Sequence, residues 1–587
     1  MKHNKLITMM AMTLSLSLTS CSDDDKGNVA TQDGVQKSVI SAQQSQSEIM
    51  SFIPADTPVL MLFAKDEKHP LPQNLKDKME KVYSSLGDIM KMAMEDSLKK
   101  NVNDDEKTAE MTALMDKWLS EEGLSKLGFA MDENEFALYA VDLFPVFRMT
   151  LAKTHAMDEV LNELMGKANE SKPDSASKRE VSGSTVYQFG DKEVQVMVSL
   201  AGNTIVASLS PSRDVDQLMP KLLGFEKPSK SVQQSNQYNE TKSKYNYIGN
   251  SIYWVNIRQI ADYFVNSSQY DSAMLDIMKV QDNMLSADCK TEMLGIFDKF
   301  PRIVGGSTLL EEHKIDSHMI IEMADGLGSK FSALSGRIPS TNDGSAMSYG
   351  FSFDIAAAKN LAMEFVTNIE TVPYKCELLQ DMNAQAVMLK EQLSQPLPPF
   401  VGNFKGVNVV IDELELDLTK KDPNEMVKSL NAKVLLAVDN PEALKGMAEM
   451  MMPDLQKLGI NVGAGAVNVS SLIPVSGSQM PINLDHIFLA MGSETIGLSL
   501  GEGTDTVLTS VVAGESTSDL LNFSISADLY KDIFAGIEEF SGTFSEDIKQ
   551  QMSMQKAMMT DMLWWKNESG KLDFTDRGFE ITVDISY

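Results

Sequence analysis

Three segments of the chain read SIYWVNIRQIADYFV (251–265), MSYGFSFDIAAAKNLAMEFV (347–366) and LNFSISADLYKDIFAGI (521–537). Each starts with an apolar run typical of a strand and continues with the periodicity of an amphipathic helix. Asn256, Asp354 and Asp528 stand at the predicted helix starts, where side-chain oxygens can accept hydrogen bonds from free backbone N–H groups. The recurrence predicts a fold built by repetition of strand–helix units.

Three further units also occur twice and in the same order. They are a strand and helix at 146–165 and 431–452, a hairpin and helix at 198–224 and 488–514, and a closing hairpin at 306–323 and 570–586. In the hairpin–helix unit, Ser210 and Pro211 predict the start of the first helix. Because each pattern alone is common, the shared order is the evidence for an internal duplication.

These units predict an α+β fold made of two homologous halves. We expect the first half at residues 51–335 and the second at residues 345–587, joined by the Pro- and Gly-containing stretch 337–345. Hairpins dominate, so the sheets should be mostly antiparallel with helices packed on one face.

Residues 1–20 have the parts of a secretory signal, with Lys2 and Lys5, an uncharged apolar stretch, and small residues before Cys21. The apolar stretch is shorter than the roughly 20 residues of a membrane-spanning helix. Leu18–Cys21 resembles the lipobox of bacterial lipoproteins. This resemblance implies a lipoprotein signal peptide that is cut before Cys21, and diacylglycerol and an acyl chain such as palmitate on that cysteine. The alternative is an ordinary secretory signal with an incidental cysteine.

The segment 21–50 predicts how the protein is held at a membrane. After the lipidated Cys21, residues 22–50 are rich in Ser, Gln and Asp, which is the composition of a flexible tether. Ser22 resembles the sorting residue of outer-membrane lipoproteins, whereas Asp23–Asp25 resemble an acidic export tag. We expect a lipid anchor on the periplasmic face of the outer membrane, with the cell surface as the alternative.

Charge and cysteine content narrow the possible partners. The chain has 52 basic and 83 acidic residues, and loss of residues 1–20 would remove only Lys2 and Lys5. Such a negative field repels nucleic acid, so we expect no nucleic-acid partner. Cys289 and Cys376 are the two other cysteines. In an oxidising compartment an even number favours a disulfide between them, and two buried thiols are the alternative.

A search for catalytic motifs predicts no catalytic, cofactor or metal site, and we expect that the protein is not an enzyme. The chain lacks a Gly-x-Ser-x-Gly elbow, a phosphate-binding loop and any metal-ligand spacing of histidines. We interpret His318 as a surface or half-buried residue. Methionines cluster at 90–94, 447–452 and 552–562. They are expected to fill helix faces or contact surfaces rather than bind copper.

Four stretches of the mature chain are similar to uncharacterised proteobacterial periplasmic lipoproteins. They are Ile53–Pro58, Asp142–Arg148, Pro373–Cys376 and Pro396–Gly402. The resemblance covers most of the mature chain and implies the same architecture. It brings no assigned activity and no catalytic residue.

Together these features predict a membrane-anchored envelope lipoprotein with a non-catalytic binding or scaffold function. Its expected partners are the membrane, through the lipid anchor, and an envelope protein or peptide. One alternative is a carrier of a lipid or another apolar ligand. Another is a hydrolase whose site has no recognised motif.

Overall fold

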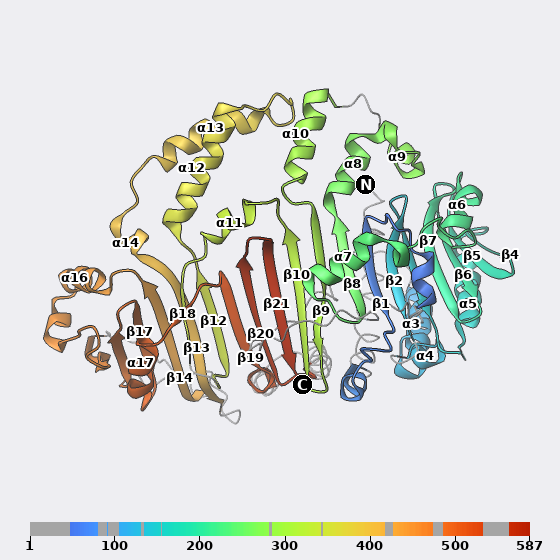
Figure 1. Ribbon diagram of the computed structural model, residues 1–587. Coiled ribbons are helices and arrows are strands. Elements are labelled where there is room, and N and C mark those ends of the chain that lie inside the picture. The colour runs from blue at the N-terminus through green and yellow to red at the C-terminus, as the bar shows by residue number, and fades with distance from the viewer. Residues whose placement is uncertain are drawn as a thin grey trace, which may run out of the picture. The chain divides into compact units, whose positions relative to one another are not determined.

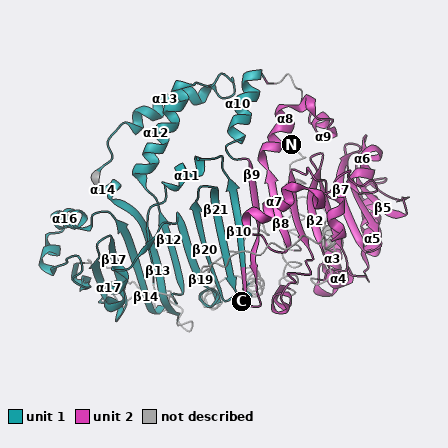
Figure 2. Ribbon diagram, in the orientation of Figure 1, with its two compact units in different colours: residues 1–23, 286–300, 316–587 teal, residues 24–285, 301–315 magenta. Residues whose placement is uncertain are grey.

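The computed structural model describes residues 47–79, 91, 105–130, 134–153, 155–280, 285–341, 344–416, 427–472, 485–531 and 563–587. Cys21 and the predicted signal and tether lie outside these ranges. The described chain forms two compact units (Figure 2). Unit 2 contains residues up to 285 and residues 301–315, and unit 1 contains residues 286–300 and 316–587.

These units are defined by contacts, whereas the predicted halves are defined by sequence similarity. Residues 286–300 and 316–335, which lie in the predicted first half, belong to unit 1. The predicted domain boundaries therefore stay a prediction. Both units mix helices with antiparallel strands, which confirms the coarse α+β class (Figure 1).

Unit 2 is built on one antiparallel sheet. The strand order is β4 (Ala176–Val181), β5 (Ser184–Gly190), β6 (Val194–Ala201), β7 (Thr204–Pro211), β3 (Phe144–Thr150), β2 (Phe136–Val141), β1 (Val59–Ala64), β8 (Asn250–Asn256) and β9 (Arg302–Leu310). Its helices are α3 (Asp105–Trp118), α4 (Glu121–Lys126), α5 (Met157–Ser171), α6 (Val215–Leu222), α7 (Asn236–Tyr245), α8 (Ile257–Val265) and α9 (Ala273–Ile277).

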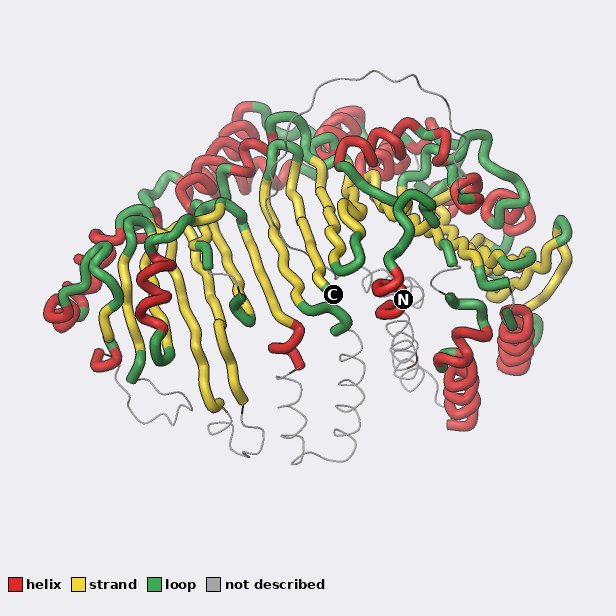
Figure 3. The backbone as a smooth tube through the Cα atoms, turned by 60° about the horizontal axis from the view of Figure 1, so that its bottom comes forward, coloured by secondary structure: helices red, strands yellow, loops and turns green. Residues whose placement is uncertain are grey.

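The strands of unit 1 are also antiparallel and lie side by side as one layer (Figure 3). The order is β15 (Val467–Asn468), β16 (Ile487–Met491), β17 (Thr495–Leu500), β14 (Val427–Val438), β13 (Phe404–Leu416), β12 (Met347–Ser352), β19 (Leu521–Ser526), β20 (Asn567–Phe574), β21 (Gly578–Ser586) and β10 (Lys314–Glu322). Its helices are α10 (Ala287–Phe297), α11 (Leu327–Ser332), α12 (Ile355–Thr371), α13 (Gln380–Leu393), α14 (Pro399–Asn403), α16 (Pro441–Met451) and α17 (Thr504–Val512). The short strands β11 (Ile338–Pro339) and β18 (Ser516–Thr517) form a separate pair.

The strands of the two units share one connectivity over seven strands. In unit 2 these strands lie in the order β6-β7-β3-β2-β1-β8-β9, and in unit 1 the order is β16-β17-β14-β13-β12-β19-β20. The chain visits the matching positions in the same sequence in both units. Helices α5 and α16 follow β3 and β14, and helices α6 and α17 follow β7 and β17.

The local predictions of helix starts are partly confirmed. The Asn256 side chain accepts a hydrogen bond from the Gln259 N–H (3.0 Å), and Asp354 accepts one from the Ala357 N–H (2.8 Å). The prediction for Asp528 is wrong. The residue before it is already helical, and the Asp528 N–H donates to the Ser526 hydroxyl (3.3 Å), so the serine side chain accepts at this helix start.

The predicted helix start at Ser210 and Pro211 is also wrong. Pro211 is the last residue of β7 and lies opposite Val194 of β6, and α6 begins only at Val215. The hairpin continues further than the pattern indicated, because a proline at the end of a strand removes no hydrogen bond that the ladder needs.

The disulfide prediction is confirmed. Cys289 of α10 and Cys376, which lies between α12 and α13, are joined in unit 1 with their Cα atoms 4.3 Å apart. Both cysteines are fully buried. The Glu292 carboxylate accepts hydrogen bonds from the backbone N–H groups of Lys375 (2.9 Å) and Cys376 (3.0 Å). A covalent bond and a carboxylate therefore hold α10 against the connection between α12 and α13.

Candidate binding surface

One face of the unit 1 sheet carries rows of apolar side chains. The cross-strand registers place Phe523, Tyr349, Val409, Val434 and Leu498 directly opposite one another across β19, β12, β13, β14 and β17. Side chains that are opposite in register point to the same side of a sheet. These residues therefore form one continuous row.

Two further rows flank the central one on the same five strands. By the same registers, one row contains Leu521, Phe351, Val407, Leu436 and Ile496. The other row contains Ile525, Met347, Ile411, Ala432 and Leu500. We call the three rows together the apolar face. They contain no charged and no hydrogen-bonding side chain except the hydroxyl of Tyr349.

The centre of the apolar face is open to solvent. The exposed fractions are 48% for Tyr349, 41% for Phe351, 39% for Val409, 38% for Val434 and 39% for Leu498. Single exposed apolar residues are common on protein surfaces, but contiguous apolar patches mark interaction sites. Because these residues are neighbours in register, they form such a patch.

The opposite side of the same strands already has a core. There α17 contributes Leu508 and Val511 to a buried cluster with Leu435 and Ala490. The sheet is therefore hydrophobic on both sides, and α17 packs on the side opposite the apolar face.

Polar groups on the covered side have partners. Lys433 is 2% exposed, and its ammonium donates to both carboxylate oxygens of Asp412 at 2.6 Å. The buried Asn408 accepts from the Ser348 hydroxyl (3.0 Å) and donates to the Pro339 carbonyl (2.9 Å). A sheet with one wet face normally buries its apolar side and exposes its polar side. Here polar side chains are buried while apolar ones remain in contact with water.

The apolar face has a defined border at each end. Toward β16, the segment after α16 contributes Ile460 and Val469 to a small core that packs against Ile496 and Leu500. Toward β20, the row of Ile525 continues to Glu568. Burial raises the pKa of the Glu568 carboxyl to about 7. Glu568, which borders the apolar face, is therefore partly protonated near neutral pH.

The raised pKa of Glu568 has a measurable consequence for stability. The pKa of Glu568 in the folded chain lies above its ordinary value. Between these two pH values the folded chain therefore binds more protons than the unfolded chain, and the free energy of unfolding falls as pH rises. We expect Glu568→Gln to raise the free energy of unfolding by about 1–2 kcal/mol at pH 8 and to change it little at pH 5, after allowance for partial exposure.

Urea denaturation at both pH values measures this difference. Glu391→Gln, at an exposed position on α13, is the matched control and should show no such pH dependence. An equal effect of Glu568→Gln at pH 5 and pH 8 would contradict the assignment.

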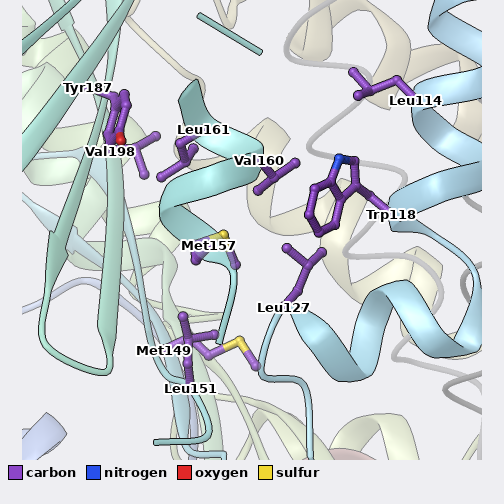
Figure 4. Close-up of a cluster of buried hydrophobic side chains, with 10 residues drawn as sticks. All are labelled: Leu114, Trp118, Leu127, Met149, Leu151, Met157, Val160, Leu161, Tyr187 and Val198. Carbon is purple, nitrogen blue, oxygen red and sulfur yellow. The ribbon is translucent and has the colours of Figure 1, made fainter. Parts of the chain in front are cut away.

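In unit 2 the matching face is covered by helices over β3 and β7. Met61, Leu138, Phe147 and Ala207 form the corresponding row across β1, β2, β3 and β7. Phe147 and Ala207 pack against a buried core to which α3, the turn after α4, and α5 contribute. Figure 4 shows the residues that these segments contribute, which are Leu114, Trp118, Leu127, Met157, Val160 and Leu161. Over these two strands the surface is thus covered by helices in unit 2, whereas Val434 and Leu498 on the matching strands β14 and β17 of unit 1 are exposed.

The interpretation of His318 as a surface or half-buried residue is wrong. His318 of β10 is buried, and its Nε2 atom lies 2.9 Å from the Glu580 carboxylate of β21. Arg577 also donates to Glu580 (2.7 and 3.0 Å), as does the Thr575 hydroxyl. Burial alone would raise the pKa of Glu580, but these hydrogen bonds outweigh it and lower the pKa to about 2. The sequence could not reveal this partner, which lies far along the chain.

Three other features bear on binding sites among the described residues: a hollow, possible metal ligands and the methionine clusters. A hollow of about 510 Å³ lies between the segment after α10, α11 and α12 in unit 1, but its Lys330 and Glu364 pair with each other. Within the described ranges no three His, Cys, Asp or Glu side chains are placed to hold a metal ion. Of the three methionine clusters only the one at 447–452 is described. Met450 and Met451 of that cluster are exposed.

Comparison of the chain with protein-family models, with curated proteins and with solved structures gave no match. The resemblance to periplasmic lipoproteins therefore stays a prediction.

Among the described helices, none combines the length and the apolar character needed to cross a membrane.

The sequence contained part of the signal for the apolar face. Met347, Tyr349 and Phe351 alternate with Ser348 and Gly350, and Val407 and Val409 are separated by Asn408. This period of two predicts a face, but it does not say which face is covered. That depends on where α17 packs, and the sequence pattern does not contain this information.

Proposed function

We propose that the chain is a non-catalytic binding protein of the bacterial envelope, anchored to a membrane by lipid on Cys21, and that it binds its partner through the apolar face. One observation carries the proposal. Five exposed apolar residues are aligned on neighbouring strands of a sheet whose core lies on the other side. Leaving such a face in water is unfavourable by roughly 25 cal/mol for each Å². A binding function gives a reason for keeping it open.

The disulfide supports an extracytoplasmic location. Disulfides form and persist in the periplasm and at cell surfaces and are rare in the cytosol. The confirmed Cys289–Cys376 bond is consistent with the proposed export and lipidation. Outer-membrane anchoring on the periplasmic face is the location that we propose.

We also propose that the halves at 51–335 and 345–587 arose by internal duplication. The shared order of seven strands and the matching places of α5 and α16 support this. Under this proposal each half inherited one copy of the same apolar surface. The copy in unit 2 is now covered by its own helices, and the copy in unit 1 became the binding surface.

Photo-crosslinking in cells tests the binding proposal. A photoreactive amino acid at Val409 of the lipidated full chain should give one discrete adduct. The adduct should be lost when Tyr349→Ser is added, because that change removes a large part of the adjoining apolar surface. The same probe at Lys428, a half-exposed polar position on β14, is the matched control.

Equal crosslinking patterns at positions 409 and 428 would overturn the proposal. Thermal melting of each variant checks that the fold is intact, since exposed positions contribute little to stability.

A further inference from the structure

We propose that the occupant of the apolar face is an amphipathic α-helix of another protein, with apolar side chains at i, i+3 and i+4 and a basic polar side. This inference rests on the proposed function and names the partner. It follows from what covers the matching surface in unit 2, from the hydrogen bonding of the strands, from the size of the face and from charge.

The matching surface in unit 2 shows which structure such a face accepts. Its cover is helical, and the apolar residues of α3 that enter the core are Leu114 and Trp118, which are four positions apart. Helix α5 presents Met157, Val160 and Leu161, at i, i+3 and i+4 (Figure 4). Residues at these spacings share one side of a helix. A helix with this pattern is therefore the complementary shape.

The strands that carry the apolar face cannot recruit a partner strand. β19, β12, β13, β14 and β17 each have a hydrogen-bonded neighbour on both sides. Recognition by added strands needs an unpaired edge. A partner at this face must therefore satisfy its own backbone hydrogen bonds, as a helix does.

The size of the face also fits a helix. Three rows on five strands cover on the order of 500 Å², from strand spacing and rise per residue. A standard interface between folded proteins takes about 800 Å² from each partner. A helix about 10 Å wide and four turns long fits within the smaller area.

Charge sets the polar side of the partner. The chain has a net charge of −31, while the apolar face itself carries no charge. Long-range attraction therefore favours a partner helix whose outward side is rich in Lys or Arg. Glu568 at the border of the face is the nearest carboxyl along the rows.

A defined peptide tests the inference. The probe is a stapled 18-residue helix with Leu and Trp at i, i+3, i+4 and i+7 and lysine elsewhere. Its controls are a scrambled peptide of the same composition and a peptide with strand-type alternation. The full chain carries Cys21→Ala, so that neither an acyl chain nor detergent competes for the face.

Fluorescence anisotropy should show saturable binding of the helix and binding at least about tenfold weaker for both controls. Val409→Asp should weaken helix binding at least about tenfold, because a charge must then be buried. Tyr349→Ser, a milder change, should weaken it several-fold. Lys428→Ala should leave it unchanged. Thermal melting identifies any variant that fails to fold.

Two results would overturn the inference. One is equal binding of the helix and the scrambled peptide. The other is saturable binding of a fluorescent fatty acid that Val409→Asp abolishes while the helix does not bind, which would indicate a carrier of apolar ligands. If the helix fails but position 409 still gives its specific crosslink in cells, the proposed function stands and only the helical partner is wrong.

Discussion

Replacing both Cys289 and Cys376 with alanine should lower the free energy of unfolding of unit 1 by about 4 kcal/mol. The bond spans a sequence separation of 87 residues. Closing a loop of this length lowers the entropy of the unfolded chain, which raises its free energy by about 4 kcal/mol. Both positions are fully buried, so alanine is preferable to serine, which would leave hydroxyl groups to satisfy there. Urea denaturation of the full chain at neutral pH measures the change.

Reduction of the wild-type protein should shift its unfolding midpoint in the same direction. The same reductant should leave the double alanine variant unchanged, and this is the internal control. Equal unfolding midpoints for oxidised wild type and the variant would show that the bond does not stabilise the fold.

Glu580→Ala should lower the free energy of unfolding by about 3 kcal/mol. The substitution removes a carboxylate that contacts buried His318 and accepts hydrogen bonds from Arg577. Removing one partner of a buried pair typically costs 3–5 kcal/mol, and the partial exposure of Arg577 places this case at the lower end. Chemical denaturation at pH 7 measures the effect.

The pH dependence gives a second measurement on the same carboxyl. Because hydrogen bonds lower the pKa of Glu580 to about 2, its stabilisation is complete above the ordinary glutamate pKa and is lost as pH falls toward 2. The difference between wild type and Glu580→Gln should therefore shrink as pH falls from 4.5 toward 2. A difference that grows over this acidic range would contradict this account.

Sequence reasoning succeeded where the structure depends on local chemistry. A helix start needs one acceptor within three residues, and Asn256 and Asp354 meet that need. The disulfide followed from there being only two candidate cysteines. Asp528 failed because Ser526 offered a competing acceptor nearby. Pro211 failed because strand pairing across the sheet, which is not local, extended the hairpin.

The candidate surface was beyond sequence reasoning because it depends on tertiary packing. The alternation of Tyr349 with small residues is visible in the sequence, but the side on which a helix packs is not. His318 shows the same limit, since its partner Glu580 is 262 positions away. Nothing in the histidine spacing could have indicated a buried acid–base pair.

The path of the chain through unit 1 has a consequence for biosynthesis. Cys289 and β10 are made early, whereas Cys376 follows 87 positions later and Glu580, the β21 residue that binds His318, follows 262 positions after that histidine. In a nascent chain released before β21 is made, β10 would lack its partner strand β21. That edge of β10 would stay unpaired and open to aggregation. The strands of unit 1 can therefore complete their pairing only after translation has reached β21. Premature termination before that point leaves β10 without β21.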